Sequence, residues 1–224
     1  AIACEPTNMQ IKIAFKGRTD YEIVVKGKHA HTSAPNEGIN AIHQMVNVIT
    51  GILRKGIRYK PHELLGDCTL SFTGIEGGSL EGVTSIPERC KAILEVRAVP
   101  GQAYQSIKEE IEQIIDVLRS DNPELETAVN ILHGRNSFEV SSDEELIRVM
   151  RSAIRAVTGK DAQYFRGGGG GGDVYYLLER GVPCTMFGPR RELHRSNEFV
   201  GIDELVNVAK IHALTALHMC EASS

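Results

Sequence analysis

The sequence predicts an α+β protein with a ferredoxin-like domain in the middle of the chain and an incomplete α/β layer at its two ends. Two observations carry this prediction. Residues 17–134 follow the order strand, helix, strand, strand, helix, strand, which is typical of a four-stranded antiparallel sheet with two helices on one face. The flanking segments contain helices but too few strands for a sheet core of their own. We therefore expect residues 1–16 and 135–224 to form parts of one α/β domain, into which residues 17–134 are inserted.

The elements of the middle domain follow from hydrophobic periodicity. Alternation with period two predicts strands, and apolar residues at helical spacing predict helices. The expected strands are Tyr21–Lys26, Cys68–Thr73, Cys90–Val96 and Glu126–Leu132, and the expected helices are Asn36–Leu53 and Gln102–Leu118. We expect a second copy to meet this domain through the helix Asn36–Leu53 and through an edge strand near Tyr21.

The terminal segments alternate between short apolar runs and helices. The expected strands are Ile2–Cys4, Gln10–Phe15 and Val182–Phe187, and the expected helices are Ser141–Val157, Asp173–Glu179 and a last one from Asp203. Beyond the last strand, a Gly-Pro turn leads to a polar loop that contains His194. Open α/β sheets place ligands at the carboxyl ends of their strands. His194 is therefore a candidate metal ligand or proton carrier, with a solvated loop residue as the alternative.

Composition narrows the class of protein. The net charge is −4, and lysine and arginine are scattered without a basic block, which gives no electrostatic footprint for nucleic acid. No apolar run approaches the roughly 18 residues that span a membrane. The five cysteines form no CxxC pair, which favours a reducing, cytoplasmic compartment. We expect a small-molecule partner, with neither nucleic acid nor membrane.

Short motifs lie in order along nearly the whole chain. They are Glu5–Thr7, Val25–Pro35, Gly38–Ile42, Ile86–Cys90, Glu95–Gly101, Gly172–Asp173, Gly181–Pro183, Phe187–Pro189 and His194–Glu198. This series resembles the dinuclear-zinc aminoacylase and carboxypeptidase family, which includes acetylornithine deacetylase and succinyl-diaminopimelate desuccinylase. The resemblance implies a zinc-dependent amidohydrolase that cleaves N-acyl amino acids or small peptides and forms a homodimer through a lid domain, residues 17–134 here.

The resemblance also implies a metal site. Glu5 matches the ligand of one zinc ion and His194 the ligand of the other, with two Zn2+ per active site and Co2+ or Mn2+ as replacements. Carboxylate oxygen and neutral imidazole are normal zinc ligands. Without the family, Glu5 would be interpreted as a solvated carboxylate at a strand end.

Three further residues receive roles from the resemblance. His31 matches a lid histidine that reaches across the dimer, where it can donate a hydrogen bond to the oxyanion formed when water attacks an amide. Arg97 matches a lid arginine that holds the substrate carboxylate, and a surface strand arginine is the alternative. Thr84 matches a substrate-binding position at which the family often has Asn.

The match to the family breaks upstream of Glu5. The family's His-x-Asp, bridging Asp and Glu-Glu pair, whose first member is the general base, have no counterpart here. Glu109-Glu110 and Glu144-Glu145 are better explained as solvated helix faces. We therefore expect about 150 to 200 further residues upstream, one domain's worth. The chain alone is expected to be inactive, and the alternative function is a non-catalytic dimerisation module.

A second break is the run of six glycines, Gly167–Gly172. A glycine-rich turn before a helix can bind an anion through its backbone N–H groups. Pure glycine is also the composition of a flexible linker. A third interpretation, which we favour, is that not all six glycines are the native residues.

Overall fold

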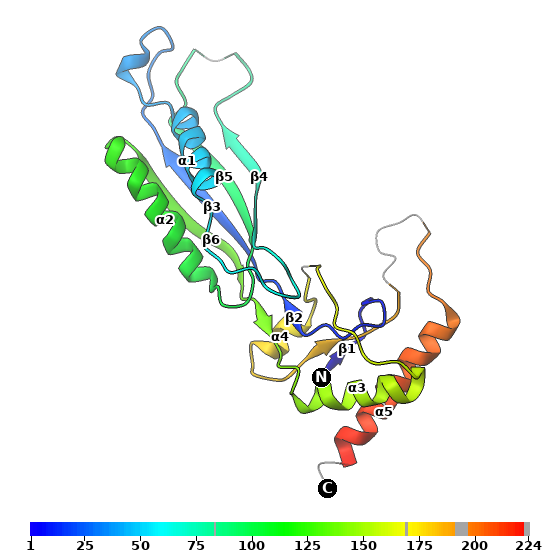
Figure 1. Ribbon diagram of the computed structural model, residues 1–224. Helices are drawn as coiled ribbons and strands as arrows, with labels where there is room; N and C mark the ends of the chain where they lie inside the picture. Colours follow the sequence, from blue (N-terminus) through cyan, green and yellow to red (C-terminus); the bar gives the residue numbers. More distant parts are fainter. Residues whose placement is uncertain (83, 169, 191–196, 222–224) are drawn as a thin grey trace. The chain divides into compact units, whose positions relative to one another are not determined.

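The computed structural model describes residues 1–82, 84–168, 170–190 and 197–221 (Figure 1). The chain forms two compact units. The sheet unit consists of Gly17–Pro61 and Asp67–Ser137, and the terminal unit of Ala1–Lys16, His62–Gly66 and Phe138–Ser224. The segment His62–Gly66 thus groups with the terminal unit, although it lies inside the range expected for the inserted domain.

The sheet unit contains one four-stranded antiparallel sheet. Its strands are β3 (Arg18–Lys26), β4 (Thr69–Gly77), β5 (Arg89–Arg97) and β6 (Glu126–Arg135), in the spatial order β4-β5-β3-β6. Helices α1 (Ala41–Lys55) and α2 (Tyr104–Asp121) cover the same face of this sheet (Figure 1). Order and topology confirm the ferredoxin-like fold class.

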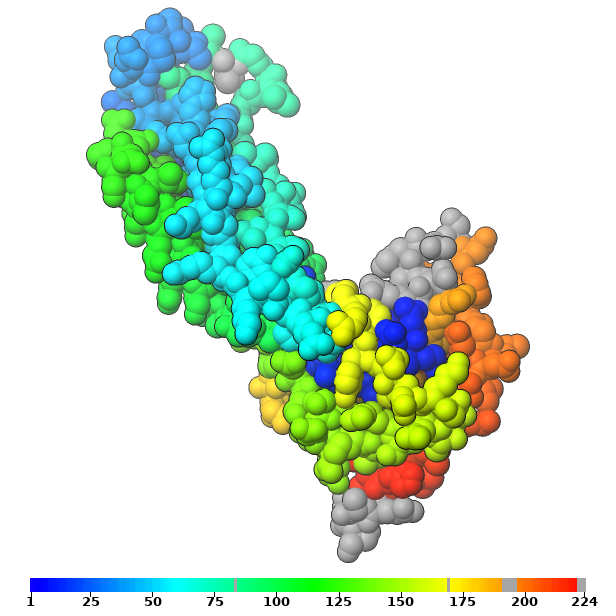
Figure 2. Space-filling model, viewed as in Figure 1, coloured from blue at the N-terminus to red at the C-terminus, as the bar shows by residue number. Residues whose placement is uncertain are grey.

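The core of the sheet unit lies between the sheet and its two helices. Strand β5 alternates between buried and partly exposed residues along its whole length, so one face packs inward and the other meets solvent. Both helices contribute an apolar stripe, and the two helices lie side by side on the surface (Figure 2). The fully buried core residues include Tyr21, Ile23, Val25, Met45, Val48, Ile52, Leu94, Val96 and Ile111.

The predicted edge strand near Tyr21 is wrong. Tyr21 lies in β3, where it pairs with Leu94 of β5 on one side and with Ile131 of β6 on the other, and its side chain is fully buried. The reason is topological: β5, which follows β4 along the chain, returns to one side of β3, and the crossover through α2 places β6 on the other side. The edges of the sheet are β4 and β6.

Helix α1 begins later than the periodicity suggested. Residues Pro35–Glu37 form a short 3-10 turn (η1), and the α-helix starts at Ala41. The Asn40 side chain accepts hydrogen bonds from Ile42 N at 2.9 Å and His43 N at 3.3 Å. An Asn cap of this kind satisfies backbone donors that the first helical turn leaves without partners, so it fixes the boundary.

The terminal unit contains two short sheets and three helices in its described part. Strand β1 (Ile2–Ala3) pairs in parallel with β8 (Thr185–Met186), and β2 (Ala14–Phe15) pairs antiparallel with β7 (Phe138–Glu139). The helices are α3 (Glu145–Thr158), α4 (Val174–Leu178) and α5 (Ile202–Glu221). The strands are shorter than predicted, since Ile11 and Lys12 form isolated bridges in place of a continuous ladder. No helix in the described residues is long and apolar enough to cross a membrane.

Candidate functional site

Glu5 lies where two parallel strands end together. It follows β1 by two residues, and Phe187 and Gly188 directly follow β8, so both loops emerge at the same edge of the pair. Thr7 Oγ1 accepts a hydrogen bond from Gly188 N at 3.1 Å, and Met9 N donates to Gly188 O at 2.9 Å. A Cβ atom at residue 188 would lie 2.4 Å from the Glu5 carbonyl oxygen, so this close approach requires glycine. The two motifs Glu5–Thr7 and Phe187–Pro189, distant in sequence, thus form one structure.

Glu5 borders a cavity of about 140 Å3 together with Lys12, Gly170 and Gly172. The Glu5 side chain is exposed, whereas Lys12 is 5% exposed. Lys12 Nζ donates a hydrogen bond to Gly170 O and lies 5.4 Å from the ring centroids of both Phe15 and Phe165. These contacts compensate a buried ammonium group. The sequence prediction missed Lys12, although a lysine between two buried isoleucines was a signal for such a role.

The glycine run lines the same cavity. Gly167, Gly168 and Gly172 have φ values of +76°, +66° and +45°, a region that L side chains rarely adopt. A Cβ at residue 172 would lie 3.5 Å from Glu5 Oε1. The three interpretations of the run stay open, but these backbone angles suit glycine itself.

The predicted metal site is partly outside the described residues. His194 falls in the range 191–196, which the structure does not describe, so its relation to Glu5 stays a prediction. Within the described residues, no group of three or more His, Cys, Asp and Glu side chains could hold a metal ion. The described donors therefore do not by themselves make up a metal centre.

His31 and Thr84 come together at one end of the sheet unit. His31 lies beyond the end of β3 and forms an isolated antiparallel bridge with Ser85, which precedes β5. Thr32 N donates to Thr84 O at 3.0 Å, and Ile86 N donates to Ala30 O at 2.8 Å. Both predicted residues are exposed. The bridge therefore presents them to solvent side by side.

The His31 ring is oriented by Ser33. The Ser33 backbone N–H donates to His31 Nδ1 at 3.2 Å, and Ser33 Oγ lies 2.7 Å from the same nitrogen. Because a backbone N–H can only donate, Nδ1 must be an acceptor, so we infer that the neutral ring carries its proton on Nε2. The sequence prediction missed Ser33, whose contacts with Nδ1 leave Nε2 as the donor of the neutral His31 ring.

Arg97 lies at the opposite end of the same sheet. Arg97 Nε donates to Glu95 Oε1 at 2.8 Å, and Arg18 Nε lies 2.9 Å from Glu95 Oε2. The hydrogen bond from Arg97, together with the two positive charges, holds the pKa of the Glu95 carboxyl below its usual value. Among the described residues, the two Nη groups of Arg97 have no hydrogen bond. The guanidinium group is therefore held at Nε and open at its far end.

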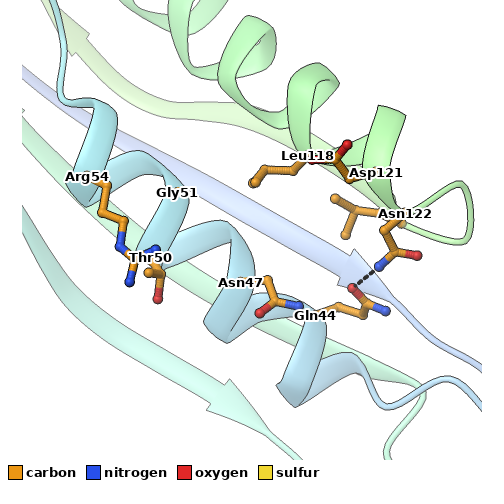
Figure 3. A pocket seen from close by; sticks show the side chains of 9 residues that line it. Gln44, Asn47, Thr50, Gly51, Arg54, Leu118, Asp121 and Asn122 are labelled. Atoms are coloured by element: carbon orange, nitrogen blue, oxygen red, sulfur yellow. Dashed lines mark hydrogen bonds between the residues drawn. The ribbon is translucent and has the colours of Figure 1, made fainter.

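Two larger cavities contain none of the predicted site residues. They lie between α1 and α2 on either side of the contact between Gly51 and Leu118, with volumes of about 340 and 390 Å3. In Figure 3, Gln44 and Asn122 close one end of the first cavity through a hydrogen bond of 2.7 Å. Size alone does not make these grooves the site, and we assign them no role in the chemistry.

Comparison with known proteins identifies the sheet unit. Residues 13–122 match the M20 family described as the peptidase dimerisation domain. The chain is 25% identical over 225 residues to acetylornithine deacetylase of Myxococcus xanthus, with 98% of this chain and 57% of the relative aligned. It is 26% identical over 219 residues to an uncharacterised metallohydrolase of Methanocaldococcus jannaschii, with 92% and 53% aligned. The chain thus spans about half the length of these curated relatives.

Solved structures agree with this assignment at the level of the fold. Aminopeptidase PepT from Bacillus cereus aligns with a TM-score of 0.75 at 16% identity, over 96% of this chain and 55% of that one. The Bacillus subtilis YXEP protein, a dinuclear metal binding peptidase, aligns with a TM-score of 0.72 at 16% identity, over 98% and 56%. Residues 13–122 thus match the M20 peptidase dimerisation domain, and the chain as a whole is similar in sequence and fold to M20 peptidases and to deacetylases of the aminoacylase and carboxypeptidase family.

Proposed function

We propose that this chain forms the lid and carboxy-terminal part of a metal-dependent amidohydrolase that cleaves N-acyl amino acids or small peptides. The observation that carries the proposal is the placement of the two kinds of substrate-binding residue at opposite ends of one sheet. His31 and Thr84 lie together beyond the Lys26–Arg89 pair, whereas Arg97 ends the nine-residue strand β5. The names of the related deacetylase and peptidases support the reaction class.

The length of the sheet supports an active site that is shared between two copies. Eight residue steps along β5 correspond to about 26 Å at about 3.3 Å per residue. The two-residue backbone of a dipeptide-sized substrate spans at most about 7 Å. His31 and Arg97 of the same copy therefore cannot bind one such substrate together. A homodimer, in which His31 of one copy serves the site that contains Arg97 of the other, satisfies both roles.

Each residue then has a distinct chemical role. The Nε2–H group of His31 donates to the amide oxygen as negative charge develops on it, which stabilises the transition state more than the ground state. The two open Nη groups of Arg97 form a fork for the substrate carboxylate. Glu95, held as a carboxylate, fixes the guanidinium group through Nε. Thr84 contacts the substrate beside His31.

The proposed cofactor is zinc, two ions per active site, with Co2+ or Mn2+ as replacements. The related dinuclear metal binding peptidase and metallohydrolase support a metal, while its identity rests on the family resemblance. Glu5 and His194 are the proposed ligands from this chain, one for each ion. The five cysteines, all of which the structure describes, form no disulfide, which supports the proposed cytoplasmic location.

The proposed dimer surface combines the β4 edge with an apolar seam on α1. The seam has helical spacing along Ile42, Val46, Ile49 and Leu53: Val46 and Leu53 are 51% and 57% exposed, and Ile42 and Ile49 are partly buried. Gly77 is the last residue of β4, and a Cβ atom added to it would lie 3.2 Å from the Ile42 side chain. The apolar seam on α1 and the β4 edge are therefore adjacent. An unpaired edge strand offers backbone N–H and C=O groups to a partner strand.

The reaction class is tested with the enzyme extended to the full length of its relatives, against a panel of N-acyl amino acids and dipeptides. We expect turnover that a chelator abolishes and added Zn2+ restores, whereas the 224-residue chain shows none. Tight, stoichiometric zinc binding with turnover by the 224-residue chain would contradict the proposed division of the site. An extended protein that forms dimers but hydrolyses no amide would favour the alternative, a non-catalytic dimerisation module.

The dimer surface is tested by charge substitution with a matched control. Val46→Glu places a charge in the α1 seam at a valine that is 51% exposed, whereas Val117→Glu changes a more exposed valine on α2, at 66%. Sedimentation should show monomers for the first variant and dimers for the second, because a buried unpaired charge opposes association. Dimers in both variants would exclude the seam as the interface.

A further inference from the structure

A five-residue loop, His62–Gly66, connects two stretches of the sheet unit but packs within the terminal unit. Its central residues Leu64 and Leu65 are 9% and 5% exposed. It is the shortest of the three segments that make up the terminal unit. Burial of these two leucine side chains anchors the short loop in the terminal unit.

His62 closes this loop. His62 N donates to Gly66 O at 2.9 Å and Gly66 N to His62 O at 2.8 Å, with Gly66 at a φ of +68°. The His62 ring accepts at Nδ1 from Leu64 N at 3.1 Å and from Leu65 N at 3.3 Å. Since Nδ1 is an acceptor, the neutral ring carries its proton on Nε2, which lies 3.3 Å from Glu139 Oε1. One side chain thus satisfies two backbone donors inside the loop and contacts β7 outside it.

The closed loop contacts the beginning of the glycine run. Gly167 N donates to Leu64 O at 2.7 Å, and Arg166 donates to Glu63 O and to Glu63 Oε1, both at 3.2 Å. The Arg166 and Glu63 side chains are 66% and 82% exposed, so their ion pair contributes little. The backbone bond between Gly167 and Leu64 is therefore the main link.

A glycine run needs such a link more than other segments do. Glycine loses more conformational freedom on ordering than any other residue, so consecutive glycines are held in one conformation only by outside contacts. Gly170 and Gly172, a few residues further on, border the cavity that contains Glu5. Lys12 holds Gly170 from one side, and Leu64 holds Gly167 at the start.

We propose that the loop His62–Gly66 is a clasp that positions the glycine run beside the Glu5 cavity, and that His62 is the positioning residue that keeps the clasp closed. The functional meaning of the clasp rests on the proposed function, in which the Glu5 cavity belongs to the active site. The clasp itself rests on the geometry of the terminal unit alone.

The test compares three substitutions in the 224-residue chain by amide hydrogen exchange at Leu64, Leu65 and Gly167. His62→Ala removes both functions of the ring. His62→Asn keeps an acceptor for Leu64 N, because an Asn side chain bonds the backbone two residues on in an Asx turn. In His62→Gln, the longer side chain can donate from its amide NH2 group to Glu139, but it does not form the Asx turn that supplies an acceptor for Leu64 N. Arg166→Ala, which removes the exposed ion pair and the side-chain hydrogen bond to Glu63 O but keeps the backbone bond between Gly167 and Leu64, is the control.

We expect His62→Ala and His62→Gln to raise exchange at all three amides about tenfold or more, as two backbone donors lose their acceptor. His62→Asn and Arg166→Ala should stay within about threefold of the parent chain. Amides of α2 should not change in any variant. Unchanged exchange at Gly167 in His62→Ala would overturn the proposal. If His62→Ala does not fold, equal exchange at Gly167 in the Asn and Gln variants overturns it, and faster exchange in the Gln variant supports it.

Turnover of the full-length enzyme separates the clasp from the proposed function. A loss of kcat in His62→Ala that His62→Asn restores would connect the clasp with catalysis. A parent enzyme without amidase activity would contradict the proposed function, while the exchange data would still decide whether the clasp exists.

Discussion

The two ends of the four-stranded sheet differ in what they expose. At one end, His31 and Thr84 lie on loops joined by a single bridge, where the exposed His31 ring is held by Ser33 through Nδ1. At the other end, Arg97 lies within β5 in a cluster of ion pairs with Glu95 and Arg18. One end offers a neutral hydrogen-bond donor, and the other offers a fixed cation.

This difference suits two separate tasks in the proposed amide hydrolysis. A neutral donor suits an oxyanion that exists only in the transition state, whereas a guanidinium group suits a carboxylate present throughout the reaction. Loss of the first should lower kcat, and loss of the second should raise KM. The following five predictions test this division, in order of decreasing effect.

The largest effect is expected for His31→Ala in the full-length enzyme. Removing one oxyanion donor lowers kcat by about 100- to 1000-fold, or roughly 3 to 4 kcal/mol. Metal content and dimerisation should not change. His29→Ala, which removes an exposed histidine two residues away, is the control and should leave kcat unchanged.

Mixed dimers test whether His31 acts across the interface. Mixing His31→Ala with His194→Ala should restore part of the activity, because one site of the mixed dimer has both its own His194 and the partner's intact donor. A mixture that exchanges subunits but stays inactive would show that the two ends of the sheet do not serve different sites.

A smaller effect is expected for Arg97→Lys. Lysine keeps the positive charge but cannot form a two-pronged bond, so KM should rise about tenfold to a hundredfold with little change in kcat. Arg89→Lys, at the other end of β5, is the matched control. An equal fall in kcat for Arg97→Lys would mean that Arg97 contributes to the transition state and not to carboxylate binding.

The orientation of His31 is expected to contribute less again. Ser33→Ala removes one neutral hydrogen bond to Nδ1, so kcat should fall by up to about tenfold, while Ser33→Thr keeps the hydroxyl and most of the rate. In His31→Ala, a second change to Ser33→Ala should cost nothing further, since the two residues act as a unit. Additive losses would give Ser33 a role of its own.

The smallest effect concerns stability and pH at the Arg97 end. The pKa of Glu95 is lowered in the folded state, so its contribution to stability is present above the ordinary glutamate pKa and is lost as pH falls through the lowered pKa. Surface ion pairs contribute less than about 1 kcal/mol. The urea midpoint of unfolding should therefore decrease between pH 7 and a pH below 4, and this decrease should be slightly larger for the parent protein than for Glu95→Gln. Identical pH dependence would mean that the cluster adds no stability.

The sequence by itself determined the elements of the sheet unit and its fold class. Alternation over Cys90–Val96 and the stripe on Gln102–Leu118 correspond to β5 and α2, because local periodicity reports which face of an element is buried. The family motifs pointed to His31, Thr84, Arg97 and Glu5 as candidates. Their placement on loops or strand ends followed from turn signals next to apolar runs.

Only the tertiary structure decided which residues meet. The central position of Tyr21 depends on strand order, which periodicity does not encode, and so the β4 edge was missed. The contact between Thr7 and Gly188 joins residues 181 apart in the sequence. Lys12, Ser33 and His62 acquire roles from acceptors and donors supplied by other segments or by the local backbone path. A sequence pattern records burial, but hydrogen bonding between distant segments is fixed only when the chain has folded.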